Sequence, residues 1–162
     1  MGKEKTLILI RGLPGSGKTT LAKALVRLFG DRWSTIATFG IATVVHLEAD
    51  FYFYKNGVYK WDADKLDAAQ NACLTQTRNS MENKTNIIVV SNCFIRLWEL
   101  EPYLNLAETF GYQTQEIITT ANFPNVHDCP QDKIERMARH FQVRPSLYCL
   151  GAYNNEDANI PV

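Results

Sequence analysis

The sequence predicts an α/β fold in three layers, with a parallel central sheet flanked by helices. Short apolar runs typical of buried parallel strands occur at residues 7–10 and 86–92. They alternate with longer segments in which apolar residues recur at helical spacing. Because successive parallel strands must be joined by a crossover, usually a helix, this alternation favours a parallel sheet covered on both faces.

The first strand leads into a glycine-rich loop and then an amphipathic segment. Residues 11–20 read Arg-Gly-Leu-Pro-Gly-Ser-Gly-Lys-Thr-Thr. Strand, loop and helix in this order satisfy the nucleotide-binding P-loop pattern and so predict a P-loop NTPase fold. The predicted nucleotide-binding residues are Gly12, Leu13, Pro14, Gly15, Ser16, Gly17, Lys18, Thr19 and Thr20.

The chemistry of the loop explains its residue types. Glycines let successive backbone N–H groups turn inward and form a nest for an anion, and the following helix N-terminus also favours negative charge. Lys18 adds a cation that can reach the β- and γ-phosphates, and the Thr19 hydroxyl is the expected Mg²⁺ ligand. The predicted cofactors are therefore ATP or GTP with Mg²⁺.

The next elements follow from turn and strand signals. Gly30 is suited to a left-handed cap, so the first helix is expected to end at residues 29–32. Residues 33–42 have no clear period and are either an irregular crossing or a short strand. Residues 43–48 are rich in β-branched side chains and predict a strand ending near Asp50. Asn56-Gly57, between aromatic residues, predicts a tight turn or small hairpin.

The second half of the chain repeats the alternation. Asp62 offers N-cap chemistry for a helix that extends to about residue 82. The strand at 86–92 is expected beside the first strand. A helix over 98–110 places Pro102 in its first turn and ends at Gly111, and a strand at 113–120 and a helix at 131–141 follow.

Length and composition limit the function. The 162 residues predict one domain over 1–143 with a tail at 144–162, and 46% hydrophobic and 21% charged residues are ordinary for a globular protein. No signal peptide or membrane span is evident, so a cytoplasmic protein with no membrane partner and no obligate protein partner is expected. The net charge of +0 gives no strong attraction to nucleic acid. Scattered cysteines predict reduced thiols: Cys73, Cys93, Cys129 and Cys149.

The polar candidates should meet at one edge of the sheet, because ligands of such folds bind at the carboxyl ends of the strands. Asp50 is the predicted catalytic base or metal-side residue, with Glu48 as the competing carboxylate. Alternation puts both on one side if their strand continues. Arg136 and Arg139, one helical turn apart, could hold a phosphate or the adenine, whereas His127 is more simply a structural hydrogen-bonding group.

These motifs give the chain a family resemblance. The P-loop, the segments at 49–53, 90–92 and 98–103, and residues 126–137 resemble the 5′-kinase domain of polynucleotide kinases, including bacterial and phage ATP-binding proteins of the small AAA or zeta-toxin-like type. The resemblance implies a phosphotransferase that moves the γ-phosphate of ATP to a hydroxyl of a nucleic-acid end or nucleoside. It also implies catalytic roles for Lys18, Asp50 and Arg136 and a metal site at Thr19 and Asp50.

The chain departs from that family at two carboxylates. Polynucleotide kinases commonly have two adjacent aspartates after the second strand, where this chain has Ala49 and Asp50. They often have an aspartate near the end of the third strand, where this chain has Ser91 and Asn92. Two alternatives to a polynucleotide kinase therefore stay open, a non-catalytic nucleotide-binding or regulatory module and a small-molecule phosphotransferase.

Overall fold

A four-stranded parallel sheet forms the centre of the computed structural model, which describes residues 5–34, 44–124 and 129–144. The strands are β1 (Thr6–Arg11), β2 (Val44–Leu47), β5 (Ile87–Ser91) and β6 (Gln113–Ile118), in the spatial order β2-β5-β1-β6. Register pairs Ile10 with Ser91 and Arg11 with Ile118, so the carboxyl ends of the strands lie together. The predicted pairing of the first strand with the strand at 86–92 is confirmed.

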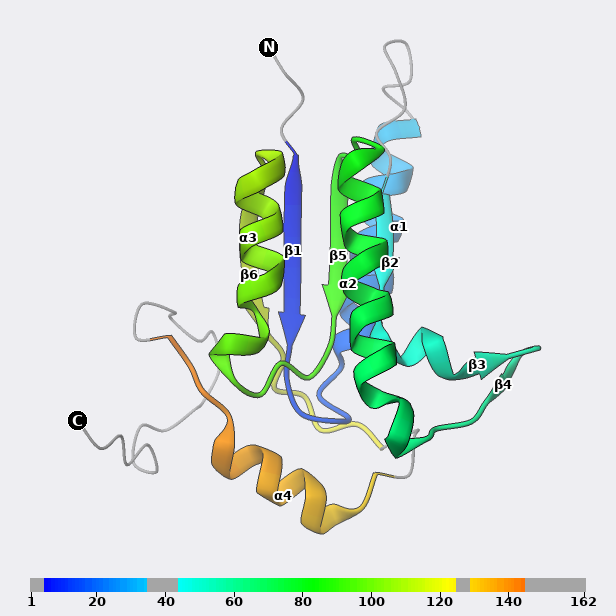
Figure 1. Cartoon of the computed structure of the whole chain (residues 1–162), viewed down its shortest axis with the longest axis vertical. Coiled ribbons are helices and arrows are strands. Elements are labelled where there is room, and N and C mark those ends of the chain that lie inside the picture. The colour runs from blue at the N-terminus through cyan, green and yellow to red at the C-terminus, as the bar shows by residue number, and fades with distance from the viewer. Residues whose placement is uncertain (1–4, 35–43, 125–128, 145–162) are drawn as a thin grey trace.

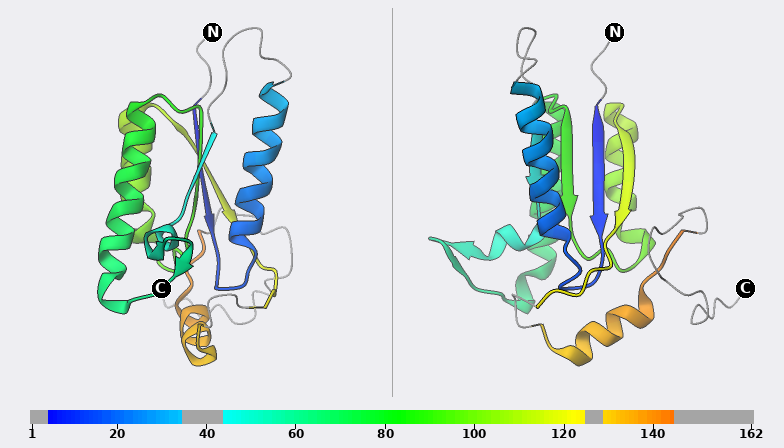
Figure 2. Two further views of the ribbon diagram at one scale, coloured as in Figure 1. Left: turned by 90° about the vertical axis from the view of Figure 1, so that its right-hand side faces the viewer. Right: turned by 180° about the vertical axis from the view of Figure 1, so that it is seen from behind.

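Helices cover both faces of the sheet, as the sequence predicts. α1 (Lys18–Ser34) lies on one face, and α2 (Leu66–Glu82) and α3 (Glu101–Phe110) lie on the other (Figure 2). Side chains alternate along β1, so Leu7 and Leu9 join the core under α2 and α3. Ile8 and Ile10 join the core under α1. The three-layer α/β architecture is thus confirmed.

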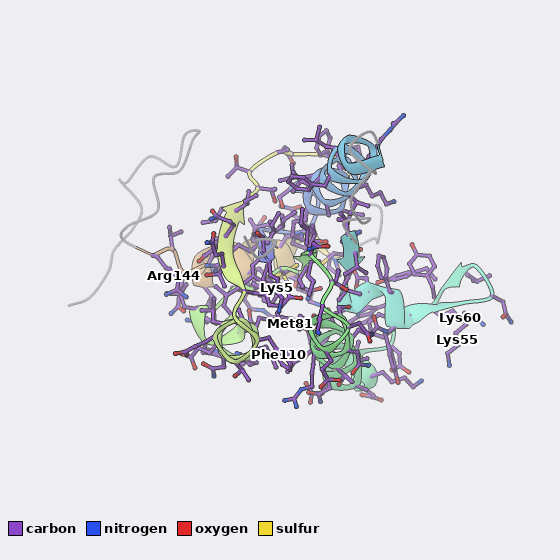
Figure 3. All side chains as sticks on the ribbon, turned by 90° about the horizontal axis from the view of Figure 1, so that it is seen from above. Lys5, Lys55, Lys60, Met81, Phe110 and Arg144 are labelled. Carbon is purple, nitrogen blue, oxygen red and sulfur yellow. The ribbon has the colours of Figure 1, made fainter. Side chains whose placement is uncertain are left out.

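Smaller elements follow the sheet edge. Short 3₁₀ helices occupy Ala49–Phe53, Ala63–Lys65 and Leu97–Glu99. A hairpin of β3 (Tyr54–Lys55) and β4 (Val58–Tyr59) projects from the body, and Figure 3 shows Lys55 and Lys60 on it, far from the sheet. α4 (Gln131–His140) lies across the carboxyl ends of the strands (Figure 1).

Local signals are correct at two turns. Asn56 and Gly57 both have positive φ, 51° and 78°, as the tight hairpin requires. Gly111 ends α3 in the left-handed conformation, with φ 70° and ψ 41°. The Asp62 side chain accepts a hydrogen bond from Asp64 N, but it caps the 3₁₀ helix Ala63–Lys65 that leads into α2, whose own N-cap residue is Lys65.

The predicted end of the first helix is wrong. α1 continues through Gly30 to Ser34, and Gly30 is not among the glycines with positive φ. A glycine inside a helix costs about 1 kcal/mol relative to alanine, and it does not by itself break the helix. Phe29 packs on the core beneath α1, which offsets that cost. Most of the predicted irregular crossing, residues 35–42, lies outside the described residues, as does the tail from 145.

None of the helices in the described ranges is long and apolar enough to cross a membrane. The cysteines of those ranges are free thiols, with Cys73 buried and Cys93 and Cys129 partly exposed.

Candidate nucleotide site

The loop between β1 and α1 has the backbone that an anion nest requires. Gly15 has a φ of 78°, and a Cβ there would lie 2.7 Å from Phe123 O. A Cβ on Gly12 would meet Ser16 Oγ at 2.4 Å and Thr119 O at 2.6 Å. Both contacts are closer than side chains tolerate, so glycine is required at these two positions to keep the loop tight.

The chain after β6 braces this loop from outside. Thr119 N donates to Arg11 O (2.9 Å), Ala121 N to Ser16 O (3.2 Å) and Phe123 N to Gly15 O (2.9 Å). The hydroxyls of Ser16 and Thr119 lie 2.7 Å apart. Backbone hydrogen bonds therefore fix the loop from the side of β6. The sequence did not reveal this brace, since it joins residues about a hundred positions apart.

Lys18 lies over the loop that it follows. Its Nζ donates to Leu13 O at 2.8 Å, and the residue is partly exposed. A single neutral carbonyl does not cancel the ammonium charge. The Lys18 ammonium would therefore be available to a phosphate bound by the loop. The phosphate-binding role of Lys18 stays a prediction.

A buried carboxylate meets the first turn of α1. Glu48, only 8% exposed, follows β2 and accepts a hydrogen bond from Thr19 Oγ1 at 2.6 Å. The same oxygen, Oε1, accepts from Ser91 Oγ at 2.5 Å and lies 3.1 Å from His46 Nε2. Burial alone would raise the pKa of Glu48, but hydrogen bonds from His46, Ser91 and Thr19 outweigh it and hold that pKa below its ordinary value.

Glu48 and Asp50 were expected on one side only if their strand continued to Asp50, and it does not. β2 ends at Leu47, and a 3₁₀ helix begins at Ala49, so the two-residue alternation stops between the two carboxylates. Glu48 faces the P-loop, whereas Asp50 is placed beside the hairpin. Burial, followed by the charge of the Asp50 carboxylate and a hydrogen bond to it, raises the pKa of Tyr59 to about 12. Asp50 remains a predicted catalytic and metal-side residue.

Asn92 has a structural contact at the same edge. Its Oδ1 accepts a hydrogen bond from Ala49 N at 2.8 Å, and its Nδ2 donates to Cys73 Sγ at 3.6 Å. The side chain therefore ties the end of β5 to the start of the 3₁₀ helix that carries Asp50.

The aromatic residues around Asp50 divide between core and surface. Phe53 is buried and packs edge-on against the half-buried Tyr59, with ring centroids 6.2 Å apart. Phe51, Tyr52 and Trp61 are exposed by 41%, 41% and 49%. The exposed members provide flat apolar faces next to the candidate base.

α4 contacts the site edge through few side chains. None of its residues is buried, and Arg136 and Arg139 are exposed. The Lys133 ammonium lies 4.7 Å from the centre of the Trp61 ring. Beyond the helix, Gln142 N donates to Ile95 O at 2.9 Å. Arg136 is thus carried by a lightly held helix at the carboxyl-end edge of the sheet, and its catalytic role stays a prediction, while His127 lies outside the described residues.

An open cavity of about 370 Å³ lies beside the P-loop, between α1 and the chain after β6. It is lined by Ser16, Gly17, Thr20, Leu21, Ala24, Thr119, Thr120, Ala121 and Phe123. Apart from Ser16, Gly17 and Thr20, no sequence signal pointed to these residues.

The donor set fits a magnesium nucleotide better than an all-protein metal centre. Within residues 5–34, 44–124 and 129–144, no group of three or more His, Cys, Asp or Glu side chains could hold a metal ion. Magnesium usually takes one or two protein oxygens and completes its shell with water and phosphate. The Thr19 hydroxyl and the nearby Glu48 carboxylate are oxygens of that kind.

Comparisons with known proteins agree with this geometry. The profile of a family described as AAA domain matches residues 7–122. Human NEDD4-binding protein 2 is 32% identical over 84% of this chain, which spans only 8% of that protein. An uncharacterized protein of Pasteurella multocida is 27% identical over 87% of this chain and 79% of its own length.

Solved structures resemble the fold at low sequence identity. Kti12 of Chaetomium thermophilum, crystallised with ADP-AlF3, has a TM-score of 0.60 and 14% identity over 85% of this chain and 80% of its own. A chain of the Pnkp1/Rnl/Hen1 RNA repair complex has a TM-score of 0.52 and 16% identity over 90% of this chain and 42% of its own. Both likenesses concern the fold.

Proposed function

The chain belongs to the AAA domain family in its P-loop kinase-like form, and from that premise we propose that it is an ATP-binding phosphotransferase. It moves the γ-phosphate of ATP, or of GTP, to a hydroxyl of a nucleic-acid end, a nucleoside or a related small molecule. The observation that carries the proposal is the 2.6 Å contact between Thr19, in the first turn of α1, and the buried Glu48. An ATP-dependent reaction also fits the cytoplasmic location that the sequence predicts.

The residues of the P-loop would hold the nucleotide. The backbone N–H groups after Gly12 and the Lys18 ammonium would bind the phosphates, and Thr19 would supply a hydroxyl ligand to Mg²⁺. The bound ion would neutralise charge on the β- and γ-phosphates. The cavity beside Thr20 and Phe123 supports a place for the base, because aromatic and apolar walls commonly line such sites.

Asp50 would act on the acceptor side. An acceptor hydroxyl gives its proton to the carboxylate while its oxygen forms a bond to the γ-phosphorus. The bond from that phosphorus to the bridging oxygen breaks, and ADP leaves. Arg136, on the helix across the same edge, would stabilise charge on the transferred phosphoryl group. The exposed faces of Phe51 and Tyr52 support an acceptor that carries a base or another flat group.

A second candidate is a nucleotide-binding module without transfer. The absent carboxylates favour it, because polynucleotide kinases commonly have an aspartate where this chain has Ala49 and often have one near the strand end where it has Ser91 and Asn92. In that case the P-loop would bind nucleotide, and the sheet edge would report the bound state to another molecule. The two candidates differ in turnover and share nucleotide binding.

The test is a transfer screen with ATP labelled in the γ-phosphate. The full chain is incubated with Mg²⁺ and with 5′-hydroxyl oligonucleotides of DNA and RNA or a panel of nucleosides. We expect label in at least one acceptor, and none with Lys18→Ala. Lys23→Ala, an exposed lysine on α1, is the matched control and should transfer normally. Nucleotide binding without transfer to any acceptor would favour the binding module.

A further inference from the structure

Glu48 is the last residue before the 3₁₀ helix Ala49–Phe53. It contacts Thr19 of the P-loop motif from the end of β2, a strand that is not adjacent to β1. β2 is separated from β1 by β5, so a side chain from the end of β2 must pass the end of β5 to reach the loop. Neighbouring strands lie about 4.8 Å apart, so a glutamate after β2 can bridge the one spacing to the end of β5. Its Oε1 reaches Thr19 Oγ1 at 2.6 Å and touches Ser91 Oγ, at the end of β5, on the way.

The hydrogen bonds around this carboxylate have a defined direction. Glu48 is an acceptor when ionised, so the hydroxyls of Thr19 and Ser91 must donate to it. The Ser91 oxygen then accepts from His46 Nε2, 2.7 Å away, and the same N–H also approaches Glu48 Oε1 at 3.1 Å, so the imidazole proton lies on Nε2. His46 is fixed in turn by an edge-on contact with Phe51, with ring centroids 5.3 Å apart.

This direction matters for the Thr19 oxygen. A hydroxyl binds a cation through a lone pair, so its proton must point elsewhere. Glu48 takes that proton and leaves the lone pairs of Thr19 Oγ1 available on the nucleotide side. Ser91, a neutral hydroxyl at the end of β5, cannot supply charge there, whereas the nearly buried Glu48 can.

We propose that Glu48 is the magnesium-side carboxylate of the nucleotide site, supplied by the residue directly after β2 in place of the residue at the end of β5, and that Ser91 and His46 are its positioning residues. The proposal rests on the nucleotide binding proposed above, and it separates the two carboxylates. Glu48 serves the metal, and Asp50, on the hairpin side near Tyr59, serves the acceptor.

The test is the effect of Mg²⁺ on nucleotide affinity, measured without turnover. Binding of fluorescent ADP to the full chain is titrated in Mg²⁺ and in EDTA. Wild type should bind more tightly in Mg²⁺. Glu48→Gln should lose about 10–100-fold of that enhancement, the range for residues that support a metal ligand, and keep wild-type affinity in EDTA. Asp50→Asn should keep the enhancement.

A rescue variant separates a role at the metal from a structural role. Ser91→Asp restores a carboxylate to the end of β5, so Glu48→Gln with Ser91→Asp should regain Mg²⁺-enhanced binding. Unchanged affinity in EDTA shows that each variant is folded. The proposal is overturned if Glu48→Gln responds to Mg²⁺ like wild type, if Asp50→Asn alone loses the response, or if the double variant stays deficient. This experiment measures binding and not phosphoryl transfer. A lack of transfer in the screen described above would therefore contradict the proposed phosphotransferase activity and leave the proposed role of Glu48 unaffected.

Discussion

Arg11, the last residue of β1 and the one before the P-loop motif, is completely buried and forms an ion pair with Glu116 of β6, Nη1 to Oε1, at 2.8 Å. Its Nε also donates to Phe94 O at 3.0 Å, and its guanidinium lies 4.6 Å from the centre of the Phe141 ring. The second oxygen of Glu116 accepts from Arg144 at 3.0 Å, and Figure 3 shows Arg144 beside β6. Arg11 is therefore a structural residue beneath the nucleotide site.

Glu116→Ala should lower the free energy of unfolding by about 3 kcal/mol, because it leaves the buried Arg11 charge without its carboxylate. Urea denaturation measures the loss. Gln115→Ala, at the adjacent exposed position of β6, is the control and should change stability little. Equal effects of the two substitutions would mean that the ion pair contributes nothing beyond its strand position.

Tyr112 gives the fold an alkaline sensitivity. Its hydroxyl donates to Thr85 O at 2.6 Å, and burial raises the pKa of the phenol above its ordinary value of 10.0. A raised pKa in the folded state gives stability that is complete below the unfolded value and is lost as pH rises through the folded value. Tyr112→Phe should cost about 1 kcal/mol at neutral pH and flatten the decline above about pH 10.

Urea denaturation across that pH range checks this expectation, with the exposed Tyr52→Phe as control. The same alkaline decline in Tyr112→Phe and wild type would assign the effect to other groups.

Nucleotide with Mg²⁺ should stabilise the fold, since a ligand that binds only the folded state adds free energy by mass action. At one hundred times the dissociation constant the gain is about 2.7 kcal/mol, visible as a rise in Tm. Lys18→Ala should remove most of the gain, whereas Lys23→Ala should retain it. If saturating ATP and GTP leave the Tm of wild type unmoved, the P-loop does not bind nucleotide.

Asp50→Asn should reduce phosphoryl transfer by about 10²–10⁴-fold, the usual contribution of a general base, and leave nucleotide affinity nearly unchanged. The P-loop binds phosphate in ground and transition states alike, whereas a base acts mainly in the transition state. Single-turnover transfer and equilibrium binding measure the two quantities separately. Full turnover in Asp50→Asn would remove the residue from the acceptor side.

α4 should exchange its amide hydrogens faster than β5 and become protected when nucleotide binds. None of its residues is buried, whereas every residue of β5 is. Elements that close over ligands come from the less stable parts of a structure. Hydrogen exchange with and without ATP measures both states. Protection equal to that of Val89 and Val90, and unaffected by nucleotide, would exclude a lid role for α4.

Most of the fold could be predicted from the sequence because its turns and helix ends depend on the conformations of single residues. The glycines of the loop, the Asn56-Gly57 turn and the Gly111 cap each depend on backbone conformations that few residues adopt. Gly30 misled the prediction, because the same residue is tolerated inside a helix when its neighbour packs on the core. Because glycine is compatible with both the end and the interior of a helix, a glycine alone does not predict where a helix ends.

The site was less accessible to sequence reasoning, because its contacts join distant parts of the chain. The P-loop, Glu48 and Asp50 were all candidates, but alternation could not tell which carboxylate faces Thr19. That choice depends on β2 ending at Leu47 and on the register that pairs Leu47 with Val90, so that Glu48 and Ser91 both follow at the same edge. The brace from Thr119 to Phe123 depends on the pairing of β6 with β1, which no local pattern specifies.

The hydrogen bonds from the chain after β6 hold the phosphate loop in shape before any nucleotide arrives. In kinetic terms, binding then requires no slow rearrangement of the loop. The observed association rate should rise in proportion to nucleotide concentration and reach no plateau at the first step. A later phase that is independent of concentration would report movement elsewhere, and the lightly held α4 is the element in which to look for it.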